Sequence, residues 1–360
     1  MNAPASELAC EARLNLRHLP RYMDNIADRL RSFEADSTQE GQRIGFRFAF
    51  GDGSFDLDRL VMRASAADRD GLARVKDLLA TAVQVYAKEE SPEIVWTGDL
   101  AGETSLAQFR QMTVVDVHDL TPRMRRVRFS GEDLGRFAKF GGMHIRVLFP
   151  TRDVPDPQWP VLGANGLPSW PEDDRRPVAR VYTIRALDVT AGWMDVDFLV
   201  HPGESVGSAW AMQARAGMTV GIMGPVGRPV RQAQWYVMGC DETGLPALSR
   251  LLESLPATTR GIAFVEVADI GERQYIANAT AIELRWLERN GAAPGTDPRL
   301  AEAVCSVAWP QDGTGFGWFA AEAEASRIVR DHWRVTLGLG RDATLAANYW
   351  RRGTAGLMAG

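Results

Sequence analysis

The sequence predicts a chain of three parts: a small α+β module, a small antiparallel β-barrel and an α/β domain built on a parallel sheet. Two amphipathic helices flank a strand pair in residues 1–98, short strands with glycine-marked turns fill residues 105–230, and strands alternate with helices in residues 231–353. The chain of 360 residues is long enough for two or three domains, each with its own core.

The first module contains two segments with apolar residues at helical spacing, Leu19–Phe33 and Leu72–Tyr86. Between them we expect a strand pair that turns at Gly51-Asp52-Gly53, because Asp-Gly pairs favour tight hairpin turns. The apolar stripes of the two helices predict an ordinary core, so we assign this module no chemistry.

The second part has the pattern of a small antiparallel barrel, with several short strands and one helix. We expect strands over residues 111–117 and 123–129, joined by a turn at Thr121-Pro122, and further strands over 141–150, 180–185, 193–200 and 217–225. The strand over 141–150 begins with Gly141 and Gly142, and the helix starts near Ser208. Residues 151–179 form an insertion rich in Pro, Trp and Asp, which is either a flap over a binding site or a disordered surface loop.

The strand Arg180-Val-Tyr-Thr-Ile-Arg185 is the most informative segment of the barrel. Alternation puts Arg180 and Tyr182 on one face, with the Thr183 hydroxyl close by. A flavin dinucleotide requires such a set: a guanidinium for the pyrophosphate, a ring to stack on the isoalloxazine and a hydroxyl for its polar edge. The alternative is an exposed strand with a solvated arginine and a cross-strand tyrosine.

A glycine-rich turn precedes the barrel helix. Its sequence, Gly203-Glu204-Ser205-Val206-Gly207, matches the elbow of serine hydrolases. We interpret it instead as a turn that presents the backbone N–H groups of Ser208 and Ala209 to the pyrophosphate.

The third part alternates strands and helices, which predicts a parallel sheet with crossover helices. Strands are expected over residues 235–239, 261–267, 282–287 and 317–320, and helices over 245–255 and 325–336, with Thr243 a candidate cap of the first helix. Ligands bind beyond the carboxyl ends of parallel strands, where Asp241, Glu242, Thr243 and Glu322 fall. The full glycine fingerprint of dinucleotide-binding folds is absent from this region.

Composition indicates a cytoplasmic enzyme. The net charge of −5 argues against a nucleic-acid-binding surface. No apolar run is long enough to cross a bilayer, and an N-terminus carrying Glu7 and Glu11 does not resemble a secretory signal. The three cysteines, Cys10, Cys240 and Cys305, are too few and too far apart for an iron–sulfur cluster, and we expect no metal site.

Four blocks in the right order make the chain resemble the siderophore-interacting protein family of FAD-dependent ferric-siderophore reductases, which are related to ferredoxin reductases. The blocks are Arg180–Arg185, Asp197-Phe-Leu-Val-His201 with Trp210, Asp241-Glu-Thr-Gly-Leu-Pro-Ala247 and Asn348-Tyr-Trp-Arg351, and the resemblance covers residues 105–353. It implies that the barrel binds FAD and that the α/β domain binds NAD(P)H, with the C-terminal segment near the flavin. Residues 1–98 look like an accessory module that precedes some members, without the histidines associated with it.

The resemblance also implies roles for individual residues. Those expected to bind the cofactors are Arg180, Tyr182, Thr183, His201, Gly207, Ser208, Ala209, Trp210, Asp241, Glu242, Thr243, Glu322 and Trp350, and those expected to contact the substrate are His144, Arg146 and Arg351. The chain departs from the family pattern at Cys240, Ala321 and Asn348, where we expect glycine. Cys240 and Ala321 would each add a side chain where a ligand approaches the backbone.

The implied reaction passes electrons from NADPH, NADH or reduced ferredoxin through FAD to a ferric siderophore, which releases iron as Fe(II). Outer-sphere electron transfer needs no general acid or base, so no catalytic side chain is assigned. Two alternatives remain open at this stage: a ferredoxin- or flavodoxin-type NAD(P)H reductase, and a protein that binds a ferric chelate without turning it over.

Overall fold

The computed structural model describes residues 7–140, 142–201, 203, 205–227, 229–310 and 314–354. The chain divides into two compact units: residues up to 109 together with 156–176, and residues 110–155 together with 177–360. The predicted fold class is confirmed, because an α+β module, a closed antiparallel barrel and a parallel sheet follow one another along the chain. The finer boundaries at 98, 105, 230 and 231 stay a prediction, since barrel and parallel sheet belong to one compact unit.

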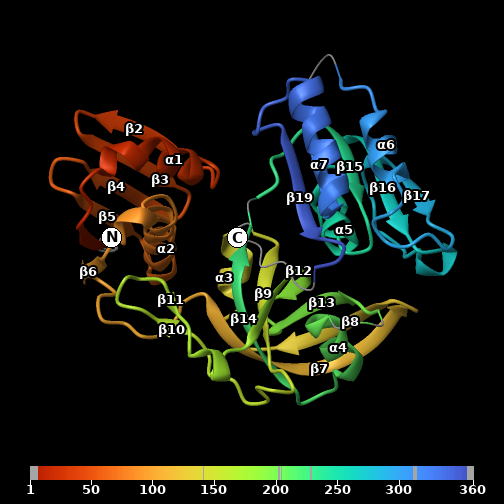
Figure 1. Cartoon of the computed structure of the whole chain (residues 1–360), viewed down its shortest axis with the longest axis horizontal. Coiled ribbons are helices and arrows are strands. Elements are labelled where there is room, and N and C mark those ends of the chain that lie inside the picture. Colours follow the sequence, from red (N-terminus) through yellow and green to blue (C-terminus); the bar gives the residue numbers. More distant parts are fainter. Residues whose placement is uncertain are drawn as a thin grey trace, which may run out of the picture. The chain divides into compact units, whose positions relative to one another are not determined.

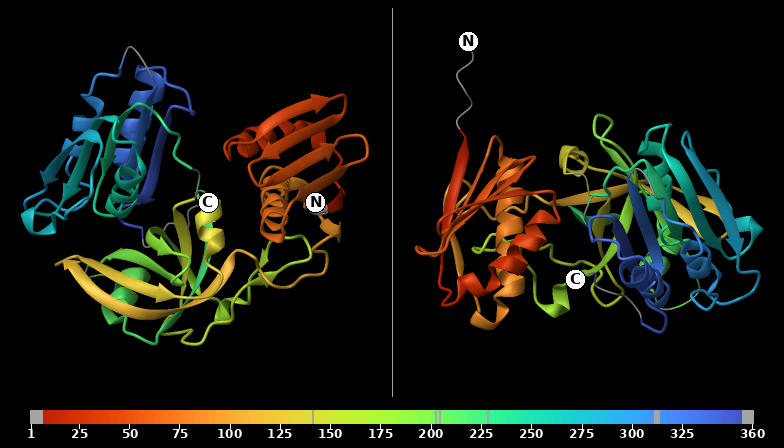
Figure 2. Two further views of the ribbon diagram at one scale, coloured as in Figure 1. Left: turned by 180° about the vertical axis from the view of Figure 1, so that it is seen from behind. Right: turned by 90° about the horizontal axis from the view of Figure 1, so that it is seen from above.

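The first unit is built on a six-stranded antiparallel sheet with the order β2-β3-β4-β5-β1-β6. Its helices, α1 (Leu19–Arg31) and α2 (Arg69–Tyr86), lie on one face of the sheet (Figures 1 and 2) and bury their apolar stripes in a shared core. Both helices were expected from the periodicity of their apolar residues. The strands are β1 (Leu8–Leu14), β2 (Asp36–Glu40), β3 (Arg43–Phe48), β4 (Gly51–Asp56), β5 (Val61–Ala66) and β6 (Ile94–Gly98).

The expected turn at Gly51-Asp52-Gly53 is wrong, because these residues begin strand β4 and the turn lies at residues 49–50. Gly51 is required for another reason. Its φ is +154°, and a Cβ atom there would lie 2.4 Å from the carbonyl oxygen of Ser65 on the next strand. The glycine therefore permits a close approach of two strands and does not mark the hairpin.

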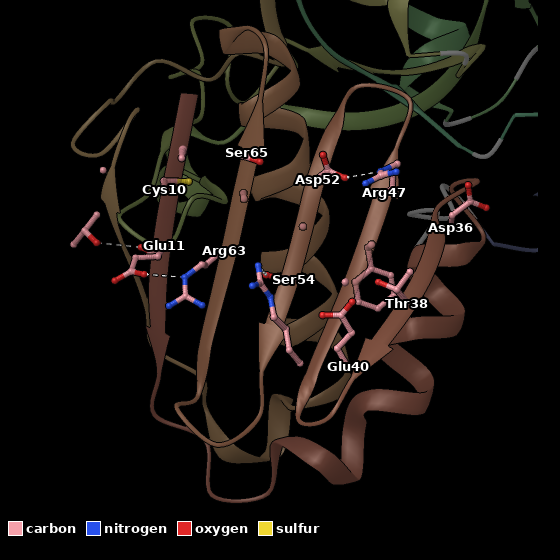
Figure 3. A pocket seen from close by; sticks show the side chains of 18 residues that line it. Cys10, Glu11, Asp36, Thr38, Glu40, Arg47, Asp52, Ser54, Arg63 and Ser65 are labelled. Carbon is pink, nitrogen blue, oxygen red and sulfur yellow. Dashed lines mark hydrogen bonds and ion pairs between the residues drawn. The ribbon is translucent and has the colours of Figure 1, made fainter. Parts of the chain in front are cut away.

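The other face of this sheet is polar and carries a hollow of about 720 Å³ (Figure 3). Cross-strand ion pairs join Arg63 to Glu11 at 3.1 Å and Arg47 to Asp52 at 3.3 Å. Acidic and basic side chains alternate over this face, so its charges are largely balanced. This is the face that an antiparallel sheet commonly exposes to solvent.

The insertion between residues 156 and 176 belongs to the first compact unit. It forms a short hairpin, β10 (Val161–Leu162) and β11 (Pro168–Ser169), and a single helical turn over Asp173–Arg175. Its tip packs against the module: the indole Nε1 of Trp96 donates to the carbonyl of Asn165 at 3.1 Å, and Leu167 contacts the core. The segment therefore packs on the N-terminal module. The sequence suggested either a flap over a binding site or a disordered loop, and neither interpretation included this contact.

The second unit begins with a closed barrel of the order β12-β13-β8-β7-β14-β9. The strands are β7 (Phe109–Thr121), β8 (Met124–Ser130), β9 (His144–Phe149), β12 (Val178–Asp188), β13 (Trp193–Leu199) and β14 (Thr219–Val226), and the helices are α3 (Gly135–Lys139) and α4 (Val206–Gln213). The predicted strands and the turn at Thr121-Pro122 are confirmed, while Gly141 lies outside the described residues. The interior is filled by Ile145, Val147, Phe149, Phe198 and Trp210, among others.

The parallel sheet has the order β17-β16-β15-β18-β19. Its strands are β15 (Trp235–Cys240), β16 (Arg260–Val267), β17 (Ala281–Glu288), β18 (Gly315–Glu322) and β19 (Thr344–Trp350). Helix α5 (Leu245–Ser254) packs on one face, and α6 (Arg299–Cys305) and α7 (Ala323–Asp331) pack on the other, so that two apolar cores enclose the sheet (Figure 1). This is the doubly wound arrangement, in which ligands bind at the carboxyl edge of the strands.

Several contacts join the barrel to the α/β region within this unit. The imidazole Nε2 of His144 lies 2.6 Å from the hydroxyl of Tyr349, and Arg250 donates to the carbonyl of Ile184 at 2.9 Å. Thr121 donates to Glu272 at 2.5 Å. In the part of the chain that is described, no helix is both long and apolar enough to cross a membrane.

Candidate functional site

Arg180 and Tyr182 lie on one face of β12, as alternation predicts. They pair with Val147 and Ile145 of β9, so both side chains are on the side of the strand that faces the barrel core. The ring of Tyr182 lies 4.4 Å from that of Phe198, and burial raises the pKa of its hydroxyl well above the usual value. The guanidinium of Arg180 donates to the carbonyl of Ala179 at 2.8 Å. A cation and an aromatic ring are therefore neighbours at one end of the barrel.

Thr183 does not share that face. It pairs with His144 across β9 and is buried at 4% exposure, so its hydroxyl is on the opposite side of β12 from Arg180 and Tyr182. The side chain of Thr183 therefore points away from the face that Arg180 and Tyr182 share, as alternation along a strand requires, and its role at the cofactor stays a prediction.

The start of helix α4 is arranged differently from the expected turn. Ser208 uses its hydroxyl to tie this helix to the end of β13, accepting from the N–H of His201 at 2.8 Å and donating to its carbonyl at 2.9 Å. The N–H of Ala209 donates to the carbonyl of Ser205 inside the helix at 2.9 Å. The amides without an intrahelical acceptor are therefore those of residues 206–208. Pro202 and Glu204 of the same turn lie outside the described residues.

Gly207 and Tyr182 are in close contact. A Cβ atom on Gly207 would lie 1.8 Å from the Tyr182 hydroxyl oxygen, so only glycine fits beside this ring. Trp210 follows one turn later and packs in the barrel core, 5.2 Å from the ring of Phe149. Its Nε1 is buried without a hydrogen-bond partner among the described residues.

These residues fit a bound FAD. Arg180 would supply a cation for the pyrophosphate, Tyr182 would supply a partly buried aromatic face, and helix α4 would offer backbone N–H groups at its positive end. The Ser205 side chain makes no capping hydrogen bond, so it does not compete for those N–H groups.

Asp241, at the end of β15, is held by side chains from two directions. One carboxylate oxygen accepts from the N–H and the hydroxyl of Thr243 at 2.9 and 2.5 Å, and the other accepts from the indole of Trp350 at 2.6 Å. Burial and the neighbouring charge of Glu242 raise the pKa of Asp241 to about 6. Thr243 is not the helix cap that we expected, because its hydroxyl bonds to Asp241 and the cap position falls at Gly244.

Glu242 takes part in a buried ion-pair network that the sequence did not predict. Arg289 bonds Glu242 at 2.6 and 2.9 Å and Glu266 at 3.0 Å. Burial raises the pKa of Glu266 to about 7 despite this pairing. Glu266 is near the end of β16 and Arg289 follows β17, so the parallel sheet brings together residues that are far apart in the chain.

Glu322 ends β18 at the same edge of the sheet. One of its oxygens accepts from the N–H of Glu324 at 2.5 Å, at the start of α7, and the other accepts from the N–H of Arg352 at 3.1 Å. The structure thus brings Asp241, Glu242, Thr243, Glu322 and Trp350 to one edge, as strand order predicts. Cys240 and Ala321 are fully buried in the two cores, and the expectation that they add side chains where a ligand approaches the backbone stays a prediction.

The three predicted substrate residues lie on β9 and after β19. His144 is partly buried against Tyr349, and burial together with the charge of Arg250 lowers its pKa to about 4, which keeps it neutral at pH 7. Arg146 is two residues further along β9 and is partly buried, whereas Arg351 is exposed just beyond β19. The sequence indicated this group only through the resemblance.

Comparison with known proteins gives a consistent result. Residues 113–229 match the siderophore-interacting FAD-binding domain, and residues 233–353 match the siderophore-interacting protein domain. The ferric vibriobactin reductase ViuB of Vibrio cholerae is 32% identical over 242 residues, which are 65% of this chain and 86% of that protein. The NADPH-dependent ferric-chelate reductase of Escherichia coli is 33% identical over 54% of this chain and 76% of its own.

Solved structures lead to the same family. A siderophore utilization protein from T. fusca has a TM-score of 0.58 at 33% identity, covering 71% of this chain and 97% of that one. The siderophore-interacting protein SipS from Aeromonas hydrophila has a TM-score of 0.59 at 29% identity, covering 69% of this chain and 93% of that one. The domain matches begin at residue 113, so most of the first compact unit lies outside them.

Proposed function

This chain belongs to the siderophore-interacting protein family and is an FAD-dependent oxidoreductase that uses NAD(P)H, and we propose that it reduces ferric siderophores in order to release their iron. In the balanced reaction, one NAD(P)H and two ferric chelates give one NAD(P)⁺, two ferrous chelates and one proton. Bound FAD supplies a carrier that accepts an electron pair and passes electrons on one at a time.

The observation that carries the flavin assignment is the juxtaposition of Arg180, Tyr182 and the start of α4. The guanidinium and the free amides of the helix match a pyrophosphate, and the Tyr182 ring matches a flat apolar cofactor. The contact of Gly207 with Tyr182 supports a shared site, because it brings the helix start within reach of the strand that carries Arg180.

We propose that Arg146 and Arg351 attract the substrate. Ferric siderophores are bulky and often anionic, so an open mouth with fixed cations suits them better than a closed pocket. His144 is neutral at pH 7 and bonded to Tyr349, which supports a role in positioning the C-terminal strand rather than in binding charge. We also propose reduced ferredoxin as an alternative electron donor and the cytoplasm as the location.

The test is flavin binding. Purified protein is expected to be yellow and to release FAD, not FMN, on denaturation. Arg180→Ala removes charge-assisted hydrogen bonds worth about 1.5–3 kcal/mol, so FAD should bind roughly tenfold to a hundredfold more weakly in a fluorescence titration. Arg47→Ala, which removes an 81% exposed guanidinium from the first module, is the matched control and should leave FAD affinity unchanged. A colourless protein without affinity for added FAD would overturn the assignment.

A further inference from the structure

We propose that Asp241 and Glu322 are positioning residues for substrate binding: their carboxylates anchor the chain on either side of Arg351 and so hold its guanidinium in place for an anionic ferric chelate. This inference deepens the proposed function and rests on it. The resemblance implies that both carboxylates contact a cofactor, whereas the geometry of the C-terminal segment gives them this further role.

The chain just before Arg351 is anchored through the side chain of Trp350. Strands β18 and β19 shift register by one residue here, which places a bulge in β19 directly before Trp350, and bulges re-aim the side chains beside them. The indole Nε1 donates to Oδ2 of Asp241 at 2.6 Å, and Asp241 is buried at 5% exposure. Because a carboxylate is a stronger acceptor than a neutral oxygen, this bond fixes the ring at the sheet edge.

The chain just after Arg351 is anchored through its backbone. The N–H of Arg352 donates to Oε1 of Glu322 at 3.1 Å, and Glu322 is buried at 6% exposure. The carbonyl of Arg351 accepts from the N–H of Thr354 at 3.2 Å, which closes a turn over residues 351–354. Both polar atoms of the peptide group that joins Arg351 to Arg352 are therefore bonded, and the orientation of this group is fixed.

The two anchors are packed together by Gly295, in the loop between β17 and α6. Its φ is +68°, and a Cβ atom there would lie 2.8 Å from Cγ of Glu322 and 3.0 Å from the Cη2 atom of Trp350. Only glycine fits this backbone conformation and this space without strain. The loop therefore closes over both anchors at once and leaves the C-terminal segment little room to shift.

The guanidinium of Arg351 is not used in this anchoring. The side chain is exposed and makes no hydrogen bond or ion pair among the residues that the structure describes. The acid that senses its charge is Glu324, whose pKa is lowered mainly by its hydrogen bond to Arg327 and also by Arg351. A cation on a fixed backbone is pre-organised, because a substrate that binds it does not have to order the chain.

Removal of either carboxylate separates the effect of position from the effect of charge. On charge alone, the loss of a carboxylate from this edge of the sheet would favour an anionic substrate, so its KM would fall. If the carboxylate acts by holding Arg351, the KM rises instead. The two explanations therefore predict changes of opposite sign for Asp241→Ala and Glu322→Ala.

The experiment compares steady-state kinetics of the FAD-loaded protein with two acceptors, the anionic chelate ferric EDTA and a neutral quinone. Asp241→Ala and Glu322→Ala should each raise the KM for ferric EDTA roughly three- to fivefold, with much smaller changes in kcat and in the KM for the quinone. The difference should shrink as ionic strength rises. Asp241→Asn retains an oxygen that can accept from the indole and should return the KM to near its original value.

Two further variants complete this comparison. Trp350→Phe removes the same hydrogen bond as Asp241→Ala while the carboxylate stays in place, and it should raise the KM for ferric EDTA by a similar factor. Glu324→Ala is the matched control, because it removes a carboxylate whose charge reaches Arg351 but which is bonded to Arg327 and to no residue of the C-terminal segment. Its KM for ferric EDTA should be unchanged or lower.

A second readout follows the anchored peptide group without reference to activity. Trypsin cleaves after arginine, and the bond between Arg351 and Arg352 is the one whose N–H donates to Glu322. Glu322→Ala should therefore increase the rate of cleavage after Arg351, measured by mass spectrometry on the FAD-loaded protein. Glu324→Ala should leave that rate unchanged.

A KM for ferric EDTA that is unchanged or lower in both alanine variants would overturn the positioning role, as would equal increases for ferric EDTA and the quinone. Variants that weaken only the binding of NAD(P)⁺, measured by calorimetry, would restrict both carboxylates to the cofactor and also overturn it. In these cases the unaltered protein still reduces ferric EDTA, so the proposed reductase function stands. If the unaltered protein reduces no ferric chelate, the proposed function fails and this inference fails with it.

Discussion

His144 illustrates how a single buried side chain couples stability to pH. Its Nε2 lies 2.6 Å from the Tyr349 hydroxyl, so a β9 side chain in the barrel is bonded to the last strand of the parallel sheet. Burial and the charge of Arg250 lower its pKa from 6.5 to about 4 in the folded protein. The folded state therefore holds this histidine neutral over a range in which the unfolded chain protonates it.

The sign of the resulting pH dependence follows from that difference. Above pH 6.5 both states are neutral and stability is unaffected, whereas between pH 6.5 and about 4 the unfolded state binds the proton more strongly and stability falls. The loss amounts to at most about 3 kcal/mol at the lower end of that window. Denaturant unfolding across this window should show a smaller loss for His144→Gln, and an unchanged loss for His118→Gln, whose side chain is 50% exposed. An identical pH profile for the unaltered protein and His144→Gln would contradict the assignment.

Individual residues also show which parts of the site could be predicted from the sequence and which could not. Arg180, Tyr182, Asp241 and Glu322 were identified because each stands at a position defined by strand alternation or by a strand end. Arg289 was missed, since nothing in its local sequence distinguishes it from a solvated arginine. Its importance comes from two carboxylates brought to it by neighbouring strands of the sheet.

Among the glycines that the structure describes, Gly207 at the start of helix α4 leaves the least room for a side chain. The first turn of this helix lies against β12 through Gly207, where a Cβ atom would be 1.8 Å from the Tyr182 hydroxyl oxygen. Tyr182 is itself packed against Phe198, so the ring has little room to move. The position of α4 relative to β12 therefore depends on the absence of a side chain at residue 207.

Replacing Gly207 by a larger residue should destabilise the protein, and a second substitution at Tyr182 should restore part of the stability. Gly207→Ala is expected to lower the free energy of unfolding by about 1–3 kcal/mol and to weaken FAD binding, because the ring must shift. Adding Tyr182→Phe removes the hydroxyl at 1.8 Å but leaves ring atom Cζ 2.9 Å from the new methyl group, so it should recover only part of the lost stability in thermal unfolding. Gly135→Ala in α3, where the nearest atom would be 3.9 Å from the new methyl group, is the control. A double variant no more stable than Gly207→Ala would contradict this account.

Helices and strands whose apolar residues recur at a regular spacing were predicted correctly. Strands that form only because a neighbouring strand pairs with them were not. The helices α1, α2 and α5 and the core strands of barrel and sheet follow from apolar spacing. Strands β1, β2, β5, β6 and β19 were missed, because their residues are polar or mixed and become strands only through their neighbours. The hairpin turn was misplaced at Gly51 since a glycine that permits close strand approach has the same local appearance as a turn glycine.

At the scale of the whole molecule, the chain passes between the two compact units three times, near residues 109, 155 and 176. The barrel and the parallel sheet belong to the second unit with their own cores. The segment over residues 156–176, although it lies in sequence between two barrel strands, depends on the first module for its packing.

Removing the first module should therefore leave flavin binding intact while exposing the apolar surface of the insertion. A chain that begins at Gly98 is expected to fold and to retain FAD, but its insertion loses the indole of Trp96 and exposes Leu167, so the protein should associate in size-exclusion chromatography. Replacing residues 156–176 by a short Gly-Ser linker in the same shortened chain should restore a monodisperse peak. Loss of FAD from both shortened chains would mean that the flavin site needs the first module.

The docking of the insertion has a consequence for the order of events during synthesis. The indole of Trp96 and its acceptor, the carbonyl of Asn165, are 69 residues apart. At roughly 5–20 residues per second the ribosome delivers the second partner roughly 3–14 s after the first. During that interval the nascent module has all six strands of its sheet but lacks the hairpin that completes its surface.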